Sequence, residues 1–205
     1  MSFGKFCVPA IIVLFLIGPG MARGWAALSA EERPLILSHD LSVALLPGTH
    51  ELLARDEIVV DAPIGTPDLA FTLAPTLHIE SVTAVALTGQ STAGSLDSAV
   101  TVTTERLAQQ ARQRVLVTLP KARDRRVTLA WTYRGAIDDP PKEPRHLRFV
   151  TPSETAGHIG PEGVYLGGES QWYPDIDGSY SAYRLTVQVP HGWTAVTQGR
   201  QTEST

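Results

Sequence analysis

His50 and Glu51 begin a stretch that starts like the zinc-binding helix of metallopeptidases. That helix needs the pattern H-E-x-x-H, because two histidines one helical turn apart bind the metal while the glutamate activates its water. Here the fifth residue is Ala54, and Pro47-Gly48 just before the stretch is typical of a turn. We therefore interpret His50–Ala54 as a hairpin entering a strand and predict no metal ligand in it.

The remaining residues that could do chemistry are scattered. Asp175 and Asp177 precede Gly178, but no further oxygen ligands follow at the alternating positions of a calcium loop, so a turn is the better interpretation. The only cysteine, Cys7, lies in the N-terminal segment and offers neither a disulfide framework nor a thiolate zinc site to the rest of the chain. The other histidines stand singly, at positions 39, 78, 146, 158 and 191. The sequence thus predicts no catalytic residue, no metal ligand and no cofactor in this chain.

Aromatic residues concentrate near the C-terminal end. Ten aromatic residues follow position 26, and six of them fall within residues 163–199. Residues 183–189 alternate between apolar and polar types, Pro190 stops the alternation, and it resumes over Thr194–Thr197. This pattern predicts two strands of an antiparallel sheet.

Strand patterns also fill the middle of the chain. Alternation and turn residues predict strands at 39–46, 51–61, 68–73, 77–87, 100–104, 114–119, 126–134 and 146–150. No long amphipathic helix interrupts them, so we predict an all-β fold, an antiparallel β-sandwich or a twisted saddle-like sheet. Side chains at alternate positions share one face of a strand, which predicts that Trp131, Tyr133, Leu185 and Val187 are core residues.

Three of these segments resemble a known family. They are the opening hairpin, the segment Trp131–Gly135, and the block that runs from Gly163-Val164-Tyr165-Leu166 through Trp172-Tyr173-Pro174-Asp175 to Gly199. Residues 36–199 resemble the N-terminal β-domain of the aminopeptidase N family of zinc metallopeptidases, and bacterial extracytoplasmic members in particular.

The resemblance implies a non-catalytic domain that forms one wall of an active-site cleft. It implies that zinc belongs to a C-terminal catalytic domain missing from this chain, which would be the chain's partner, and that peptides reach the domain through the parent metallopeptidase. In the family, a Glu or Gln of this domain binds the free amino group of the substrate. Glu169 is the nearest match and Gln171 the second, while Trp172, Tyr173, Pro174 and Asp175 match the domain junction.

The first 26 residues have the pattern of a secretory signal peptide. Lys5 precedes the apolar run Val8–Ile17, and small residues follow, with cleavage expected after Ala26 or, alternatively, Ala22. An uncleaved N-terminal anchor is the other interpretation. We therefore expect an exported protein, periplasmic or extracellular, with a polar lead-in at 27–35 and one domain at 36–205. Losing Lys5 and Arg23 changes the net charge from −4 to −6, so nucleic acid is not an expected partner.

Two functions remain open from the sequence. In the first, the chain is a fragment of an exported zinc aminopeptidase-like protein. In the second, it is a stand-alone extracytoplasmic β-sandwich that binds a partner through the aromatic surface around Trp172. The polar ending after Gly199 favours the fragment, because an unfinished edge strand there would be exposed.

Overall fold

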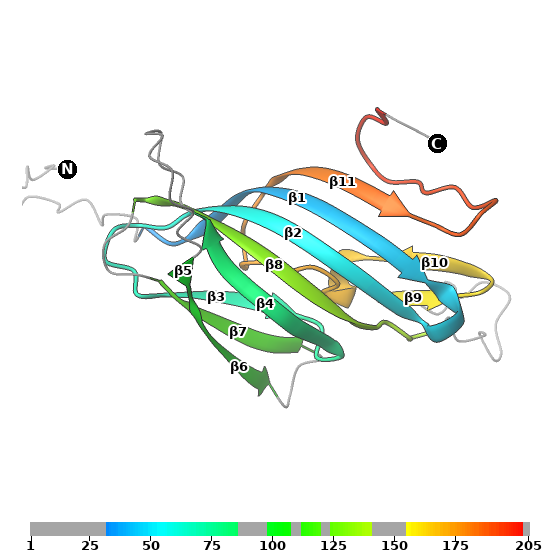
Figure 1. Ribbon diagram of the computed structural model, residues 1–205, viewed down its shortest axis with the longest axis horizontal. Coiled ribbons are helices and arrows are strands. Elements are labelled where there is room, and N and C mark those ends of the chain that lie inside the picture. Colours follow the sequence, from blue (N-terminus) through cyan, green and yellow to red (C-terminus); the bar gives the residue numbers. More distant parts are fainter. Residues whose placement is uncertain (1–31, 86–97, 108–111, 120–123, 141–154, 203–205) are drawn as a thin grey trace, which may run out of the picture. The chain divides into compact units, whose positions relative to one another are not determined.

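The computed structural model describes residues 32–85, 98–107, 112–119, 124–140 and 155–202 (Figure 1). The predicted signal peptide and the predicted strand at 146–150 lie outside these residues. Within them the chain forms strands and two short 3-10 turns but no α-helix, which confirms the all-β prediction. No helix among the described residues has the length and apolar character needed to cross a lipid bilayer.

Six strands form the larger sheet, in the order β11-β1-β2-β8-β4-β5 (Figure 1). Their bounds are Leu35–Leu46 (β1), Glu51–Asp61 (β2), Leu77–Val85 (β4), Ser98–Ala99 (β5), Arg126–Ala136 (β8) and Ala182–Gln188 (β11). Neighbouring strands are antiparallel except β1 and β11, which run parallel. Only β1 and β2 are joined by a short turn, whereas β8 and β11 come from distant parts of the chain to pair with their neighbours.

A tight turn produces the first hairpin. The 3-10 turn η1, Pro47–Thr49, joins β1 to β2, and proline suits its first position because its φ is already fixed there. His50 follows in the left-handed region with φ 58°, and this reverses the chain. The stretch His50–Ala54 is therefore a turn that enters β2, as predicted.

Three strands and one small hairpin complete the fold. The second sheet has the order β3-β7-β6. A separate hairpin pairs β9 with β10, and the 3-10 turn η2 follows it. The bounds are Asp68–Leu73 (β3), Thr101–Leu107 (β6), Arg112–Thr118 (β7), Gly157–Gly160 (β9), Gly163–Leu166 (β10) and Gly168–Ser170 (η2).

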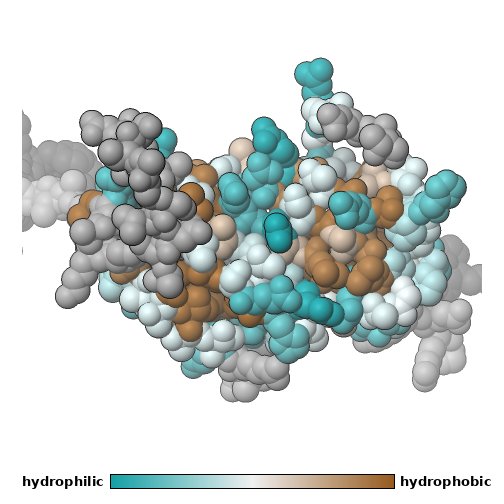
Figure 2. Space-filling view, viewed as in Figure 1, coloured by the Kyte–Doolittle hydropathy of each residue, from teal (hydrophilic) through white to brown (hydrophobic). Residues whose placement is uncertain are grey.

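The hydrophobic core lies between the two sheets. Phe71 of β3 and Trp131 of β8 meet edge to face, with ring centroids 4.9 Å apart. Trp131 and Tyr133 are 1% and 0% exposed, which confirms two of the four core predictions. Away from the core, apolar side chains gather in two patches separated by polar ones on the face drawn in Figure 2.

Three strand predictions near the C-terminus need correction. Leu185 and Val187 are only half-buried, because β11 is the edge strand of the sheet. β11 is also parallel to its neighbour, not antiparallel. Residues Thr194–Thr197 form no strand, and Val196 is 90% exposed. The alternation of apolar and polar residues over Thr194–Thr197 thus does not correspond to a strand.

A bulge in β1 positions a polar residue in the core. The register between β1 and β2 shifts between Ile36 and Ser38, so one extra residue stands on β1. Before the shift Ile36 points inward, and after it His39 and Leu41 do. The shift therefore buries His39, which an uninterrupted alternation from Ile36 would have placed on the opposite face.

Candidate functional site

The segment 167–176, which holds every site residue predicted from the sequence, is fixed to the second sheet by backbone hydrogen bonds. Thr72 donates its N–H to the Asp175 carbonyl at 2.8 Å, and Asp175 donates back to the Thr72 carbonyl at 3.1 Å. Ala74 donates to the Gln171 carbonyl at 2.8 Å. Bonds from β3 and from the residue that follows it thus hold the segment at positions 171 and 175.

Glu169 and Gln171 occupy a short turn within that segment. Glu169 is exposed in the first turn of η2, and Gln171 follows η2 in the left-handed region with φ 53°. The side-chain oxygen of Gln171 is buried and has no hydrogen-bond partner among the described residues. An unpaired buried acceptor is costly, so this oxygen would gain a partner if the side chain turned outward to a bound donor group.

The predicted junction residues lie side by side. Trp172 and Tyr173 meet edge to face with centroids 5.1 Å apart, both half-buried, and Pro174 is buried beneath them. Asp175 is half-buried and donates its backbone N–H to β3. Their role at a domain junction stays a prediction.

A hollow of about 540 Å³ opens between this segment and the β1–β11 edge. Its lining combines aromatic rings, one carboxylate and one imidazole: Trp172, Tyr173, Tyr180, Tyr183, Asp175 and His39 are among the residues. Gly168 also lines it, whereas Glu169 and Gln171 do not. The structure thus brings three of the four predicted junction residues, Trp172, Tyr173 and Asp175, into the lining of one hollow. The two predicted substrate-binding residues are not part of that lining.

Burial shapes the electrostatics of the hollow. It is the main cause that raises the pKa of Asp175 above its usual range, with Asp177 adding to it, while the Ile176 N–H and His39 oppose it. Burial likewise raises the pKa of Tyr173, assisted by Asp175 and Asp56. A half-buried carboxylate beside aromatic faces is an arrangement that suits a cationic group such as an ammonium.

His39, which lines the hollow, belongs to a buried His–Asp contact, here called the inner pair: His39 and Asp56. His39 Nδ1 donates to Asp56 Oδ2 at 2.7 Å, and the two side chains are 3% and 0% exposed. Tyr173 meets the His39 ring edge to face at 5.4 Å. Nearby, burial raises the pKa of Tyr133 well above its usual value, with the Asp56 charge as a second cause.

The inner pair was not predicted from the sequence, although the residue pattern of β2 indicates one of its members, Asp56. Inward positions along that strand are Leu52, Ala54, Asp56, Ile58 and Val60, all buried. A single carboxylate among apolar residues at every second position of a strand predicts a buried charge with a partner. The partner, His39, could not be found the same way because the β1 bulge breaks the period.

The stretch His50–Ala54, which begins like the zinc-binding helix of metallopeptidases, does not form such a helix. Glu51 is the first residue of β2 and contacts Arg134 at 3.6 Å, and Ala54 stands where the second histidine would be required. These residues lie on a strand, so they carry no pair of ligands one helical turn apart.

Comparison with known proteins shows a shared fold. No protein-family model and no curated protein matches the sequence. Among solved structures, native yeast leukotriene A4 hydrolase is similar at 12% identity and a TM-score of 0.52, over 80% of this chain and 24% of that one. Its complex with bestatin gives 13% identity and a TM-score of 0.51, over 80% and 26%. An M1 zinc metallopeptidase from Deinococcus radiodurans gives 17% identity and a TM-score of 0.46, over 76% and 32%.

The chain spans between about a quarter and a third of the length of these structures. At identities this low, the likeness to the yeast hydrolase establishes the fold and leaves the activity open. The described residues thus form an all-β domain whose fold recurs as part of larger enzymes.

Proposed function

We propose that this chain is the non-catalytic N-terminal β-domain of an exported zinc aminopeptidase-like metallopeptidase. There it walls one side of the active-site cleft and helps to hold the amino terminus of a peptide substrate. The catalytic domain that follows it is its partner, and zinc resides in that domain. The fold shared with yeast leukotriene A4 hydrolase supports the proposal, as does the resemblance of residues 36–199 to the aminopeptidase N family.

The observation that carries the recognition role is the fixed turn bearing Glu169 and Gln171. Recognition of an ammonium needs acceptor oxygens whose positions change little on binding, because ordering them would cost free energy. A backbone bond from Ala74, just after β3, holds this turn at Gln171, and Glu169 is exposed there as an acidic group. Among the described residues the Gln171 oxygen has no partner. The two side chains therefore supply a charged and a neutral acceptor within one turn.

The first experiment asks whether a catalytic domain follows. Sequencing the gene downstream of codon 205 should reveal an in-frame H-E-x-x-H within a few hundred codons. A stop codon directly after Thr205 would contradict the proposal and favour a stand-alone binding module.

The second experiment tests the recognition role in the parent protein. Glu169→Gln keeps the shape but removes the charge, so kcat/KM for peptides with a free amino terminus should fall about ten- to a hundredfold, the loss of one charge-assisted hydrogen bond. N-acetylated substrates should be unaffected. Glu57→Gln, an exposed glutamate on β2, is the matched control. Equal loss with both classes of substrate would refute the role of Glu169.

One observation favours a second function. The aromatic residues Trp172, Tyr173, Tyr180 and Tyr183 line one hollow, and Tyr180 is 99% exposed. A stand-alone extracytoplasmic binding module would use such a surface for a ligand. In that case Trp172→Ala would abolish ligand binding by the 205-residue chain without any catalytic domain present.

A further inference from the structure

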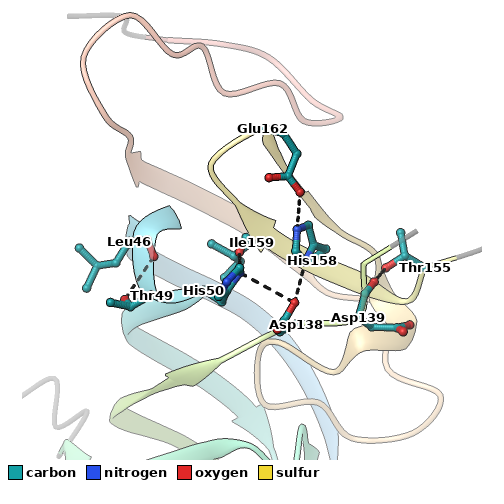
Figure 3. Close-up of polar contacts among 9 residues, drawn as sticks. All are labelled: Leu46, Thr49, His50, Asp138, Asp139, Thr155, His158, Ile159 and Glu162. Carbon is teal, nitrogen blue, oxygen red and sulfur yellow. Dashed lines mark hydrogen bonds and ion pairs between the residues drawn. The ribbon is translucent and has the colours of Figure 1, made fainter. Parts of the chain in front are cut away.

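Four polar side chains outside the lining of the hollow meet at the end of the larger sheet. They are His50, Asp138, His158 and Glu162, here called the outer cluster (Figure 3). One ring nitrogen of each histidine and one Asp138 oxygen lie within 4.8 Å of one another. The cluster joins a turn, the end of a strand and a separate hairpin, which are far apart in the sequence. Neither histidine therefore belongs to a sequence motif.

The backbone fixes the three segments against each other. Ile137 donates its N–H to the His50 carbonyl at 2.9 Å, and Ile159 donates to the Ile137 carbonyl at 3.0 Å. Asp138 and His158 form an antiparallel bridge. Main-chain bonds at or next to His50, Asp138 and His158 therefore hold these three residues in place, as a binding site requires.

His158 is oriented by one carboxylate and open toward another. Its Nε2 lies 2.7 Å from Glu162 Oε1, so the ring donates its proton there. Its Nδ1 is buried and has no hydrogen-bond partner in the part of the chain that the structure describes, although Asp138 Oδ1 is only 3.1 Å away. A Cβ at Gly160 would lie 2.3 Å from His158 Nε2, so glycine at this position leaves room for the contact.

His50 shows the same division of roles between its nitrogens. Its Nδ1 lies 2.6 Å from the Ile159 carbonyl, which can only accept, and 3.8 Å from Asp138 Oδ1. Nδ1 is therefore the donor and Nε2 keeps the lone pair, so the His50 ring must turn for Nε2 to reach an ion beside Asp138. Metal-binding histidines usually donate one ring N–H to a carboxylate or a backbone carbonyl while the other nitrogen binds the ion. His158 and His50 show these two kinds of partner.

We propose that the outer cluster binds a divalent transition-metal ion of the zinc class. His50, His158 and Asp138 are the ligands, and Glu162 positions His158. Two imidazoles with one carboxylate favour zinc over magnesium or calcium, which prefer oxygen ligands.

The spacing of the cluster suits such an ion. Ligand atoms about 2.1 Å from a tetrahedral zinc lie about 3.4 Å apart. Asp138 Oδ1 lies 3.1 Å from His158 Nδ1, and a ring nitrogen of His50 lies within 4.8 Å of the other ligand atoms. Reorientation of the His50 ring, which presents Nε2 in place of Nδ1, would thus form the site, with one position left to water.

The competing explanation is an ion-pair cluster without metal. A protonated His158 between Asp138 and Glu162 would hold the β9–β10 hairpin by itself. That explanation predicts no stoichiometric zinc binding, so titration separates the two.

The test is calorimetric titration of the 205-residue chain with zinc chloride. Every protein carries Cys7→Ser, which removes the only cysteine. We expect one zinc ion per chain with a Kd of about 10 µM or lower. His50→Gln and Asp138→Asn should each weaken binding at least about tenfold, and Glu162→Gln about 10- to 100-fold. These substitutions are preferred over His158 because the side chains of His50 and Asp138 are 38% and 48% exposed, so the fold should survive.

Matched controls are His78→Gln and His191→Gln, two exposed histidines outside the cluster, which should leave the Kd unchanged. Circular dichroism confirms that each variant is folded. Absence of saturable binding would overturn the proposal, as would a loss of less than tenfold in either His50→Gln or Asp138→Asn.

Discussion

The inner pair and the outer cluster use the same groups in different surroundings. In the inner pair, His39 and Asp56 are almost fully buried, and their remaining polar atoms, His39 Nε2 and Asp56 Oδ1, have no hydrogen-bond partner among the described residues. In the outer cluster, His158 is buried, but Asp138 is half-exposed and water can reach it. Burial decides what such a contact does. A fully enclosed pair is bound to the fold and cannot exchange partners, whereas a half-open one can release its contacts to an incoming ion.

The largest expected effect is at the inner pair. Asp56→Ala removes the carboxylate and leaves the His39 Nδ1–H buried without an acceptor, so the free energy of unfolding should fall by about 3–5 kcal/mol. Urea denaturation monitored by circular dichroism measures it. Asp56→Asn, which keeps an acceptor oxygen, should cost clearly less. If Asp56→Ala lowers the free energy of unfolding by less than about 1 kcal/mol, burial does not distinguish the inner pair from the outer cluster.

A smaller effect is expected at Asp175, which lies between the two cases in burial. Its pKa is raised above the ordinary value of 3.8, chiefly by burial. The unfolded chain therefore loses this proton at a lower pH than the folded one does, and rising pH through that window destabilises the folded state. Asp175→Asn should be the more stable protein at neutral pH, and its advantage should shrink as the pH falls toward 3.8.

The pH dependence of that difference is the measurement. Unfolding of both proteins at several pH values between neutral and mildly acidic would show it. An advantage of Asp175→Asn that stays constant with pH would mean that the carboxylate is not the cause.

The smallest effect is expected at the outer cluster without metal. In the presence of a chelator, Asp138→Asn should change the free energy of unfolding by no more than about 1 kcal/mol, as for other exposed ion pairs. With zinc at a hundred times its Kd, the unsubstituted chain should gain about 2.7 kcal/mol and the variant much less. A large loss in chelator would instead show that the cluster serves the fold alone.

Much of the fold could be predicted from the sequence because its signals are local. Turn residues and alternation indicated the bounds of β2 and β3 to the residue, and Trp131 and Tyr133 as core. Alternation shows which residues share a face, but not how deeply that face is covered. Leu185 and Val187 were misplaced for this reason, since within the described residues only one side of β11 has a neighbouring strand.

The sites were less predictable because they join distant segments. The segment 167–176 was marked by its aromatic residues, but the hollow also needs His39, which a bulge turns inward. In the outer cluster, the contact from His50 to the Ile159 carbonyl spans 109 positions. No spacing rule for a single helix or strand describes such a pair, and only the way β9 packs beside the end of β8 brings it together.

The parallel pairing of β1 with β11 has a consequence for how the chain is made. Arg184 of β11 and its ion-pair partner Asp40 of β1 are separated by 144 positions, so one edge of β1 has no strand beside it until almost the whole domain has been synthesised. Extra loop length adds little to the equilibrium cost of closing this contact. In time, however, a nascent chain carries an open, hydrogen-bonding edge for most of its synthesis. We expect β11 to join last, and expression at high concentration to favour exchange of this strand between copies.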